Sequence, residues 1–278
     1  LPPFMSDAST PLPQESDCVI APELPQEGVV RVISDLHLGH ERSEVPSIES
    51  LRPLLSGISM LIVAGDLAET RQCPWQQQAL GLRAAFRDLC AEAGVTLLEL
   101  AGNHDPDVRP LLASLWGGRV VVMHGHALFK EVAPWSWEYL RNREACDKLI
   151  AQYPNCEHDL IERLELSRAV SIGTTPIMRR DGIRNRYLRG FMHCFWPPSR
   201  PWNILRGWLT CGRRARDFAE RFLPGCETLI IGHFHRSGHW RYPGLDVYST
   251  GACFKHAQPF CADLAGGRLL RYAPWPRK

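Results

Sequence analysis

Short apolar runs alternate with helix-like segments along much of this 278-residue chain, and this alternation restricts its fold more than any other feature. Strand candidates occupy residues 28–34, 60–64, 95–100, 119–123 and 227–232. Helices are expected near 47–56, over 74–94, which opens on Pro and closes on Gly, and over 108–116. Strands that alternate with helices form βαβ units, so the pattern predicts an α/β fold with an at least partly parallel sheet.

The alternation stops at about residue 130 and resumes at 227. The segment between, about 130–225, has helical patterns, Pro breaks and most of the tryptophans, so we expect a helical cap inserted into the domain. Residues 239–254 and 266–274 are expected to form antiparallel strands with Gly turns. Residues 1–27 are rich in Pro, Ser and acids and are interpreted as a flexible tail, which leaves one domain over 28–278.

The composition is that of an ordinary globular protein. It has 45% hydrophobic and 22% charged residues, and a net charge of +2 does not by itself indicate a polyanionic partner. None of the ten cysteines forms Cys-x-x-Cys, so we expect reduced, mostly buried thiols. No apolar run approaches the roughly 20 residues of a membrane span, and the first residues lack a secretory pattern, which predicts a cytoplasmic protein.

Five of the strand candidates end in residue types that bind metals. Along the chain these ends read "SDLHLGH", "AGDLAE", "GNHD", "MHGH" and "GHFHRSG". Ligands bind at the carboxyl ends of the strands in open α/β sheets. Turn chemistry would explain one such block, but not five in order, so the set predicts one metal site at this edge. The glycines at 65, 102 and 232 are expected to let the backbone turn tightly beside it.

The five blocks are Asp-x-His, Gly-Asp, Gly-Asn-His-Asp, a His and Gly-His-x-His, and together they resemble the calcineurin-like metallophosphoesterase family. The resemblance implies a four-layer αββα sandwich of two mixed sheets. It also implies two divalent metal ions (Mn, Fe, Zn or Ni, with Mn favoured) and the ligands Asp35, His37, Asp66, Asn103, His124, His233 and His235. By the same analogy the first ion is held by Asp35, His37, Asp66 and His235. The second is held by Asp66, Asn103, His124 and His233, so that Asp66 bridges them.

The chemistry agrees with this assignment. Two ions about 3.5–4 Å apart need a shared anionic ligand, which a carboxylate supplies. His104 is not needed as a ligand, and it resembles the family histidine that stabilises phosphoryl oxygens and helps to protonate the leaving oxygen. Asp105 is expected to orient and charge that imidazole. The resemblance implies hydrolysis by a metal-activated hydroxide, without a covalent enzyme intermediate.

Two further histidines stand beside the blocks. His40 is interpreted as a surface or packing residue in preference to a functional one. His126 occupies a position where relatives often have Asp. For His126 a packing role and a role near the metals or the substrate are equally favoured.

Residues 179–221 contain eleven arginines and no lysine against three acidic residues, a net charge of +8, with aromatic residues between them. In one interpretation a cap helix packs its apolar stripe on the core and leaves the arginines in water. The stripe consists of Leu205, Trp208, Leu209, Ala215, Phe218, Ala219 and Phe222. In the other, a basic and aromatic cap contacts an anionic amphiphile or membrane surface, with Arg213 and Arg214 touching the substrate.

This cap is similar to that of bacterial UDP-diacylglucosamine pyrophosphohydrolases, which cleave a lipid precursor, although the chain departs from them at His126. We therefore expect a phosphoester or pyrophosphate hydrolase acting on a lipid-linked or nucleotide-sugar pyrophosphate, peripheral to the inner face of the membrane. One alternative is a metal-dependent nuclease or phosphodiesterase acting on nucleic acid or nucleotides. A phosphoprotein phosphatase is less favoured, and the complete ligand set argues against a non-catalytic metal-binding scaffold. The oligomeric state is not indicated.

Overall fold

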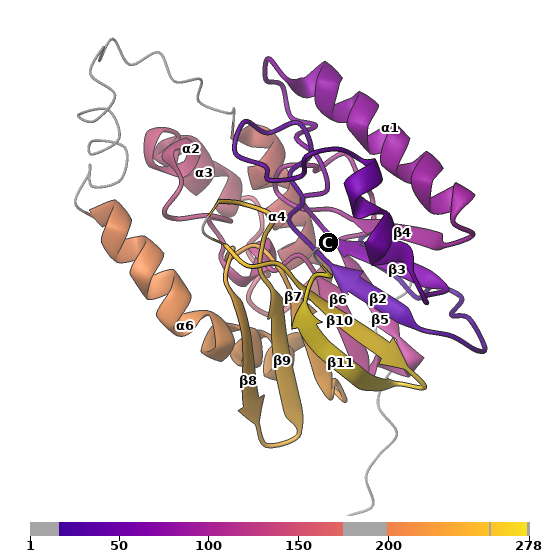
Figure 1. Ribbon diagram of the computed structural model, residues 1–278. Helices are drawn as coiled ribbons and strands as arrows, with labels where there is room; N and C mark the ends of the chain where they lie inside the picture. Colours follow the sequence, from indigo (N-terminus) through magenta and orange to yellow (C-terminus); the bar gives the residue numbers. More distant parts are fainter. Residues whose placement is uncertain (1–16, 175–198, 256, 277–278) are drawn as a thin grey trace, which may run out of the picture.

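Two mixed β-sheets pack face to face and carry helices on their outer sides (Figure 1), as expected for the αββα sandwich. The computed structural model describes residues 17–174, 199–255 and 257–276. In sheet order, the six-stranded sheet contains β1 (Val19–Ile20), β5 (Leu112–Leu115), β6 (Val120–Met123), β7 (Thr228–Ile231), β9 (Leu245–Thr250) and β8 (Ser237–Tyr242). The five-stranded sheet contains β11 (Arg268–Pro274), β10 (Phe260–Ala265), β2 (Val30–Ile33), β3 (Met60–Ala64) and β4 (Thr96–Leu100).

The helices fall into a core group and a cap group. Those of the core are η1 (Glu49–Leu55), α1 (Gln76–Glu92), η2 (Trp116–Gly118) and η3 (His126–Leu128). Those of the cap are α2 (Trp137–Arg141), α3 (Arg143–Ile150), α4 (Leu160–Gly173) and α6 (Ser199–Phe222). None of the described helices combines the length and the apolar character that a membrane crossing requires.

The layers follow from the alternation of side chains along each strand. Met60 and Ile62 of β3 lie in the buried cluster between the two sheets. Leu61 and Val63 of the same strand point the other way and pack against α1 and η1. On the far side of the molecule, α4 and α6 pack on the six-stranded sheet through a third buried cluster. Three apolar interfaces therefore hold four layers together.

Most of the expected elements are confirmed, but the helix expected at 108–116 is wrong. Leu112–Leu115 form β5, which pairs parallel with β1 and antiparallel with β6. Pairing on both edges satisfies the backbone of this short segment, and Leu112 and Leu115 are fully buried. β1 lies within the region interpreted as a tail, and residues 1–16 of that region lie outside the described residues. All described cysteines except Cys73 are buried, as expected.

The apolar stripe expected on α6 divides in two. Ala215, Phe218, Ala219 and Phe222 pack on the core, as the first interpretation requires. Leu205, Trp208 and Leu209 instead belong to an exposed group on the N-terminal half of the helix, together with Trp202. The basic residues at 179–189 lie outside the described residues.

Candidate metal centre

The seven predicted ligands all follow strand ends at one edge of the two sheets, and the structure brings them together. Six of them are buried, and the His235 side chain is 34% exposed. In one group, the Nε2 atoms of His37 and His235 lie 3.2 Å apart. Asp35 Oδ1 lies 3.3 Å from the His235 nitrogen and 3.7 Å from the His37 nitrogen. These three side chains present their donor atoms to one small volume.

A second group forms around His124. Its Nε2 atom lies 3.2 Å from Asn103 Oδ1 and 3.2 Å from Asp66 Oδ2. The His233 ring lies 5.1 Å from the His124 ring, centroid to centroid. His233 Nε2 is 3.0 Å from the Val132 carbonyl oxygen, so Nδ1 is the nitrogen of this ring available to an ion.

Asp66 stands between the two groups. Its Oδ2 atom lies 3.6 Å from His37 Nε2 and 3.2 Å from His124 Nε2. Its Oδ1 atom accepts a hydrogen bond from the His104 backbone N–H at 2.8 Å. One carboxylate oxygen is therefore anchored to the backbone, while the other faces both groups, as a bridging ligand must.

The backbone at these strand ends adopts conformations that are unfavourable for side-chain-bearing residues. Five of the ligands have φ between 49° and 71°: Asp35, His37, Asp66, His233 and His235. Such strain concentrates at functional sites, where the surrounding structure holds it. A Cβ on Gly102 would lie 2.0 Å from Asp66 Oδ1, and one on Gly232 would lie 2.3 Å from Asp35 Oδ2. The expected need for glycine beside the site is thus confirmed.

The charges of the site call for a cation. Burial alone would raise the pKa of Asp35, but the His124 charge and hydrogen bonds from two neighbouring imidazoles hold it well below its ordinary value. Burial alone would lower the pKa of His37, but hydrogen bonds to Asp35 and Glu69 raise it to about 10. Burial alone would also lower the pKa of His124, but the charges of Asp66 and Asp35 raise it to about 9. Protons on these imidazoles balance the buried carboxylates, and divalent ions can replace them.

The profile of the calcineurin-like phosphoesterase family matches residues 29–237, which include every block described above. The chain belongs to this family. Members of the family use divalent metals, and the carboxylate, imidazole and amide donors present here fit such ions. The ligands assigned to each ion remain those expected by analogy.

Solved structures share a distant likeness with this phosphoesterase chain. Chaetomium thermophilum Vps29 is 12% identical, with 85% of this chain and 80% of that chain covered and a TM-score of 0.41. A predicted phosphoesterase from Streptococcus pneumoniae is 11% identical, with 86% and 83% covered and a TM-score of 0.32. A cold-active protein-tyrosine phosphatase from a psychrophilic Shewanella is 13% identical, with 95% and 85% covered and a TM-score of 0.38. No curated protein matches the sequence.

His104 lines a cavity of about 90 Å³, together with the predicted ligands Asp66, Asn103, His233 and His235. Its Nδ1 atom lies 2.6 Å from Glu69 Oε1 and 2.9 Å from Arg71 Nη2. Glu69 Oε1 also lies 3.1 Å from His37 Nδ1, so one buried carboxylate contacts both a metal ligand and the catalytic candidate. Glu69 and Arg71 have no role predicted from the sequence, although they follow Asp66 by three and five positions.

The orienting role predicted for Asp105 is wrong. Its Oδ1 atom accepts hydrogen bonds from the backbone N–H groups of Gly102 at 2.7 Å and Asp66 at 3.0 Å. Its Oδ2 atom accepts one from Leu67 N–H at 2.7 Å. Burial and the Asp66 charge raise the pKa of Asp105 to about 7. Asp105 thus ties together the backbone after β3 and β4, while Glu69 holds the imidazole of His104.

The structure also gives the surroundings of His126 and His40. His126 is buried, its Nε2 atom lies 3.1 Å from Ser167 Oγ of α4, and its ring lies 5.3 Å from the ring of His124. It does not line the cavity, but its ring lies beside that of His124, so a role near the metals stays a prediction. Burial lowers the pKa of His40 to about 4, and its ring packs 5.2 Å from that of Phe254. The contact of His40 with Phe254 agrees with the packing role favoured for His40.

Residues of the cap also line the cavity at the metal centre, which no sequence motif predicts. Trp135, Tyr139 and Thr174 line it together with four of the predicted ligands. The two arginines expected to touch substrate do not line it. Arg213 is exposed, and Arg214 lines a second cavity.

Proposed function

We propose that this protein hydrolyses phosphoester bonds with two divalent metal ions, manganese being favoured, held at the strand ends. The observation that carries the proposal is the position of Asp66 Oδ2 between the His37 and His124 nitrogens. When bound, such ions polarise phosphoryl oxygens and lower the pKa of a bound water. Asn103 contributes a neutral oxygen, which limits the negative charge that an entering phosphate meets.

The remaining chemistry falls to residues of this chain. His104 opens onto the cavity and donates to the leaving oxygen or to a phosphoryl oxygen. Glu69 contacts Nδ1 of His104 and so fixes the orientation of the imidazole. Arg71, which lines the same cavity, adds a positive charge fixed beside the place where the phosphoryl group binds. The cap wall limits the entry of bulk water, which strengthens these interactions.

For the substrate we propose an amphiphile that carries a phosphoester or pyrophosphate, approached at an anionic membrane surface. The support is the exposed face of α6, where Trp202 and Leu209 are 63% and 70% exposed beside Arg206 and Arg213. Apolar side chains flanked by arginine suit a lipid interface. A lipid-linked or nucleotide-sugar pyrophosphate has this chemistry. A cytoplasmic location beside the inner face of a membrane follows only if this proposal holds.

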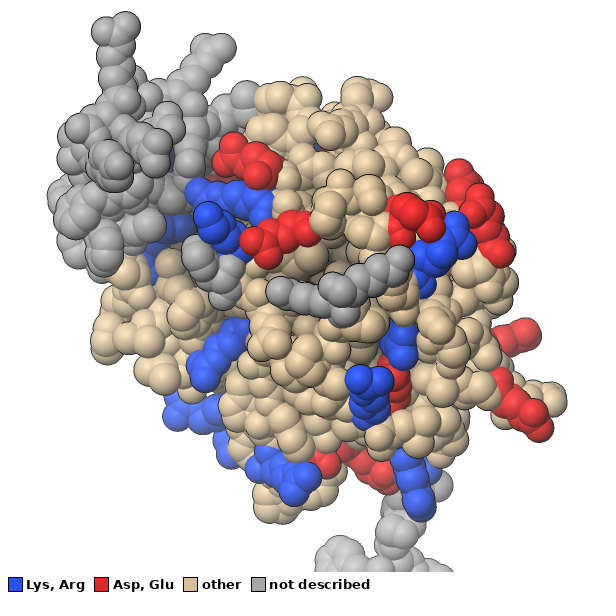
Figure 2. All heavy atoms as spheres, in the orientation of Figure 1, with Lys and Arg blue, Asp and Glu red and all other residues tan. Residues whose placement is uncertain are grey.

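Nucleic acid is the second candidate substrate. A nuclease binds the phosphate backbone through a continuous positively charged surface. Figure 2 shows Lys and Arg interspersed with Asp and Glu over the described part of one face. The amphiphile is favoured because exposed tryptophan and leucine side chains lie beside the arginines of α6.

A substrate panel with purified protein and Mn²⁺ tests the proposal. The panel consists of bis(p-nitrophenyl) phosphate, a nucleotide-sugar pyrophosphate, single-stranded DNA and a phosphopeptide. We expect turnover of the small diester and faster turnover of the pyrophosphate. Cleavage of DNA in preference to both would favour the nuclease, and the absence of turnover in metal-loaded protein would leave the non-catalytic scaffold.

A further inference from the structure

A second cavity, of about 470 Å³, lies in the cap region. It is lined by residues of the segment 128–134, by Glu157, by Arg163 of α4 and by residues of α6. Glu131 lines this cavity and also the cavity of the metal centre, so the two are neighbours across one loop. Its volume is within the range of small-molecule binding sites.

Two of the carboxylates that line this cavity are already neutralised. Glu157 forms ion pairs with Lys130 Nζ at 2.5 Å and with Arg221. Asp217 pairs with Arg216 at 2.6 Å. These contacts leave Glu157 and Asp217 little charge with which to balance further arginines.

Three other arginines line the cavity: Arg163, Arg206 and Arg214. Within residues 17–174, 199–255 and 257–276, none of the three has a carboxylate within ion-pair distance. Glu131 is the remaining carboxylate of the lining, so the positive charge exceeds the negative. Burial and the charge of Arg206 lower the pKa of Arg214, as expected where like charges gather.

Arg163 gives a second, independent indication of a ligand. It is 7% exposed, and its Nε atom donates to the Ala127 carbonyl oxygen at 2.7 Å. Its Nη1 atom is buried and has no hydrogen-bond partner among the described residues. A buried guanidinium N–H without a partner is costly, so such groups are normally satisfied. An oxyanion in the cavity would satisfy it.

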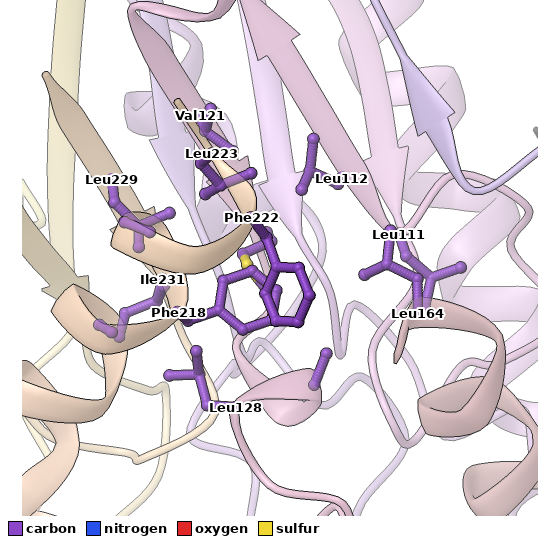
Figure 3. Close-up of a cluster of buried hydrophobic side chains, with 14 of the residues drawn as sticks. Leu111, Leu112, Val121, Leu128, Leu164, Phe218, Phe222, Leu223, Leu229 and Ile231 are labelled. Atoms are coloured by element: carbon purple, nitrogen blue, oxygen red, sulfur yellow. The ribbon is translucent and has the colours of Figure 1, made fainter. Parts of the chain in front are cut away.

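The other wall of the cavity is apolar. Figure 3 shows Phe218 and Phe222 of α6 side by side above Leu128, and their ring centroids are 4.9 Å apart. All three line the cavity, and the Arg214 guanidinium lies 4.3 Å from the centroid of the Phe129 ring. The guanidinium groups and the apolar side chains thus line the same open cavity.

We propose that this cavity binds a phosphate-type oxyanion, with the apolar wall accommodating the organic group that carries it. Arginine matches the oxygens of such an anion through paired N–H groups. The ligand is the phosphate group of an organic molecule, and free inorganic phosphate shares the same chemistry. The site is separate from the metal ligands and does not require hydrolytic activity.

Isothermal titration calorimetry on the full chain tests the site after chelation, which removes phosphate binding to metals. The probes are inorganic phosphate and benzylphosphonate, which cannot be hydrolysed. We expect one site for each probe, and about tenfold tighter binding of benzylphosphonate because its ring contacts the apolar wall. If the two probes bind with equal affinity and binding weakens when Arg206 or Arg214 is replaced, free phosphate is the ligand.

Arg206→Gln and Arg214→Gln remove single charges and should each weaken binding at least about tenfold. Arg213→Gln is the matched control, because Arg213 is exposed on the same helix and lines neither cavity. Its affinity should stay within about twofold of that of the wild type. Arg206 is itself exposed, so its variant keeps the test valid if replacement of Arg214 impairs folding. Unchanged affinity in Arg206→Gln, an equal loss in Arg213→Gln, or no binding by the wild type would overturn the proposal.

Discussion

The metal centre and the cap cavity lie on either side of one loop, yet they are built in opposite ways. Every ligand of the centre stands within a few residues of a strand end, so the sheet edge sets its position. The cavity arginines come from two separate helices, Arg163 from α4 and Arg206 and Arg214 from α6. Sites fixed by a sheet edge leave short motifs in the sequence, whereas sites fixed by helix packing leave none.

The two regions also treat charge differently. In the centre, each buried carboxylate has a neighbouring imidazole or backbone N–H, and Asp66 has both. In the cavity, Arg163 keeps an unsatisfied buried N–H and Arg214 has no carboxylate partner among the described residues. In the centre, the buried carboxylates face imidazoles, whereas the cavity keeps an excess of positive charge that an anion can balance.

Asp66→Asn should have the largest effect, because Asp66 faces both ligand groups. The neutral amide weakens the bridge, so we expect loss of at least one ion and a fall in turnover beyond the 10–100-fold typical of an outer supporting residue. Metal content by mass spectrometry and hydrolysis of a small phosphodiester measure this. Asp88→Asn, an exposed change on α1, is the matched control. Full occupancy by two ions in Asp66→Asn would break the assignment of the bridge.

His104→Ala should separate the catalytic group from the ligands. We expect both ions to remain and kcat to fall on the order of 10²–10⁴, the usual scale for a positioned acid or base. The fall should be largest for a diester with a poor leaving group, which depends most on protonation. Loss of metal, or unchanged turnover of that diester, would contradict the role.

Glu69→Gln should have a smaller effect, on both the predicted ligand His37 and the catalytic candidate His104. The amide keeps the size of the side chain but loses the charge beside His37 and His104, so both metal affinity and kcat should fall, each about 10–100-fold. Asp105→Asn is the comparison. It disturbs backbone hydrogen bonds and should lower the melting temperature. A variant of Glu69 that changed only the melting temperature would reduce its role to a structural one.

Local patterns in the sequence predict the α/β class and the metal-binding residue types at the strand ends, whereas the four-layer sandwich and the ligand assignment follow from the family resemblance. β3 occupies the expected residues 60–64, and β2, β3 and β4 are parallel neighbours with their polar ends at one edge, as βαβ geometry requires. The prediction of a helix over 108–116 is wrong because a short apolar run is compatible with a helix or a strand. Pairing of Leu112–Leu115 with β1 and β6 makes this segment a strand.

Roles that depend on side-chain direction were harder to predict. Asp105 follows His104 directly, but adjacent residues need not face each other, and its oxygens turn to the backbone after β3. Glu69 reaches His104 from another strand end, a contact that only the packed structure defines. The cap cavity joins segments that are distant along the chain, so its arginines appeared in the sequence only as an excess of charge.

The smallest effect on small-substrate chemistry is expected from the exposed face of α6. Trp202, Leu205 and Leu209 follow the spacing i, i+3, i+7 and share one side of the helix. Combined replacement of the three by Ser should reduce binding to anionic phosphatidylglycerol vesicles at least about tenfold, because their apolar surface no longer enters the interface. Turnover of a soluble phosphodiester should stay within about twofold, since the centre lies elsewhere.

The control for that experiment is replacement of exposed apolar residues on other elements, Leu80→Ser on α1 and Leu270→Ser on β11. Both should leave vesicle binding unchanged, because neither belongs to the α6 face. Binding should also fall with salt and be weak on neutral phosphatidylcholine vesicles, since arginines flank the apolar face. If the α6 variant binds anionic vesicles as the wild type does, the membrane proposal fails while the metal centre stands. If it also loses small-substrate turnover and melts lower, the exposed face serves the folded cap and not a lipid surface.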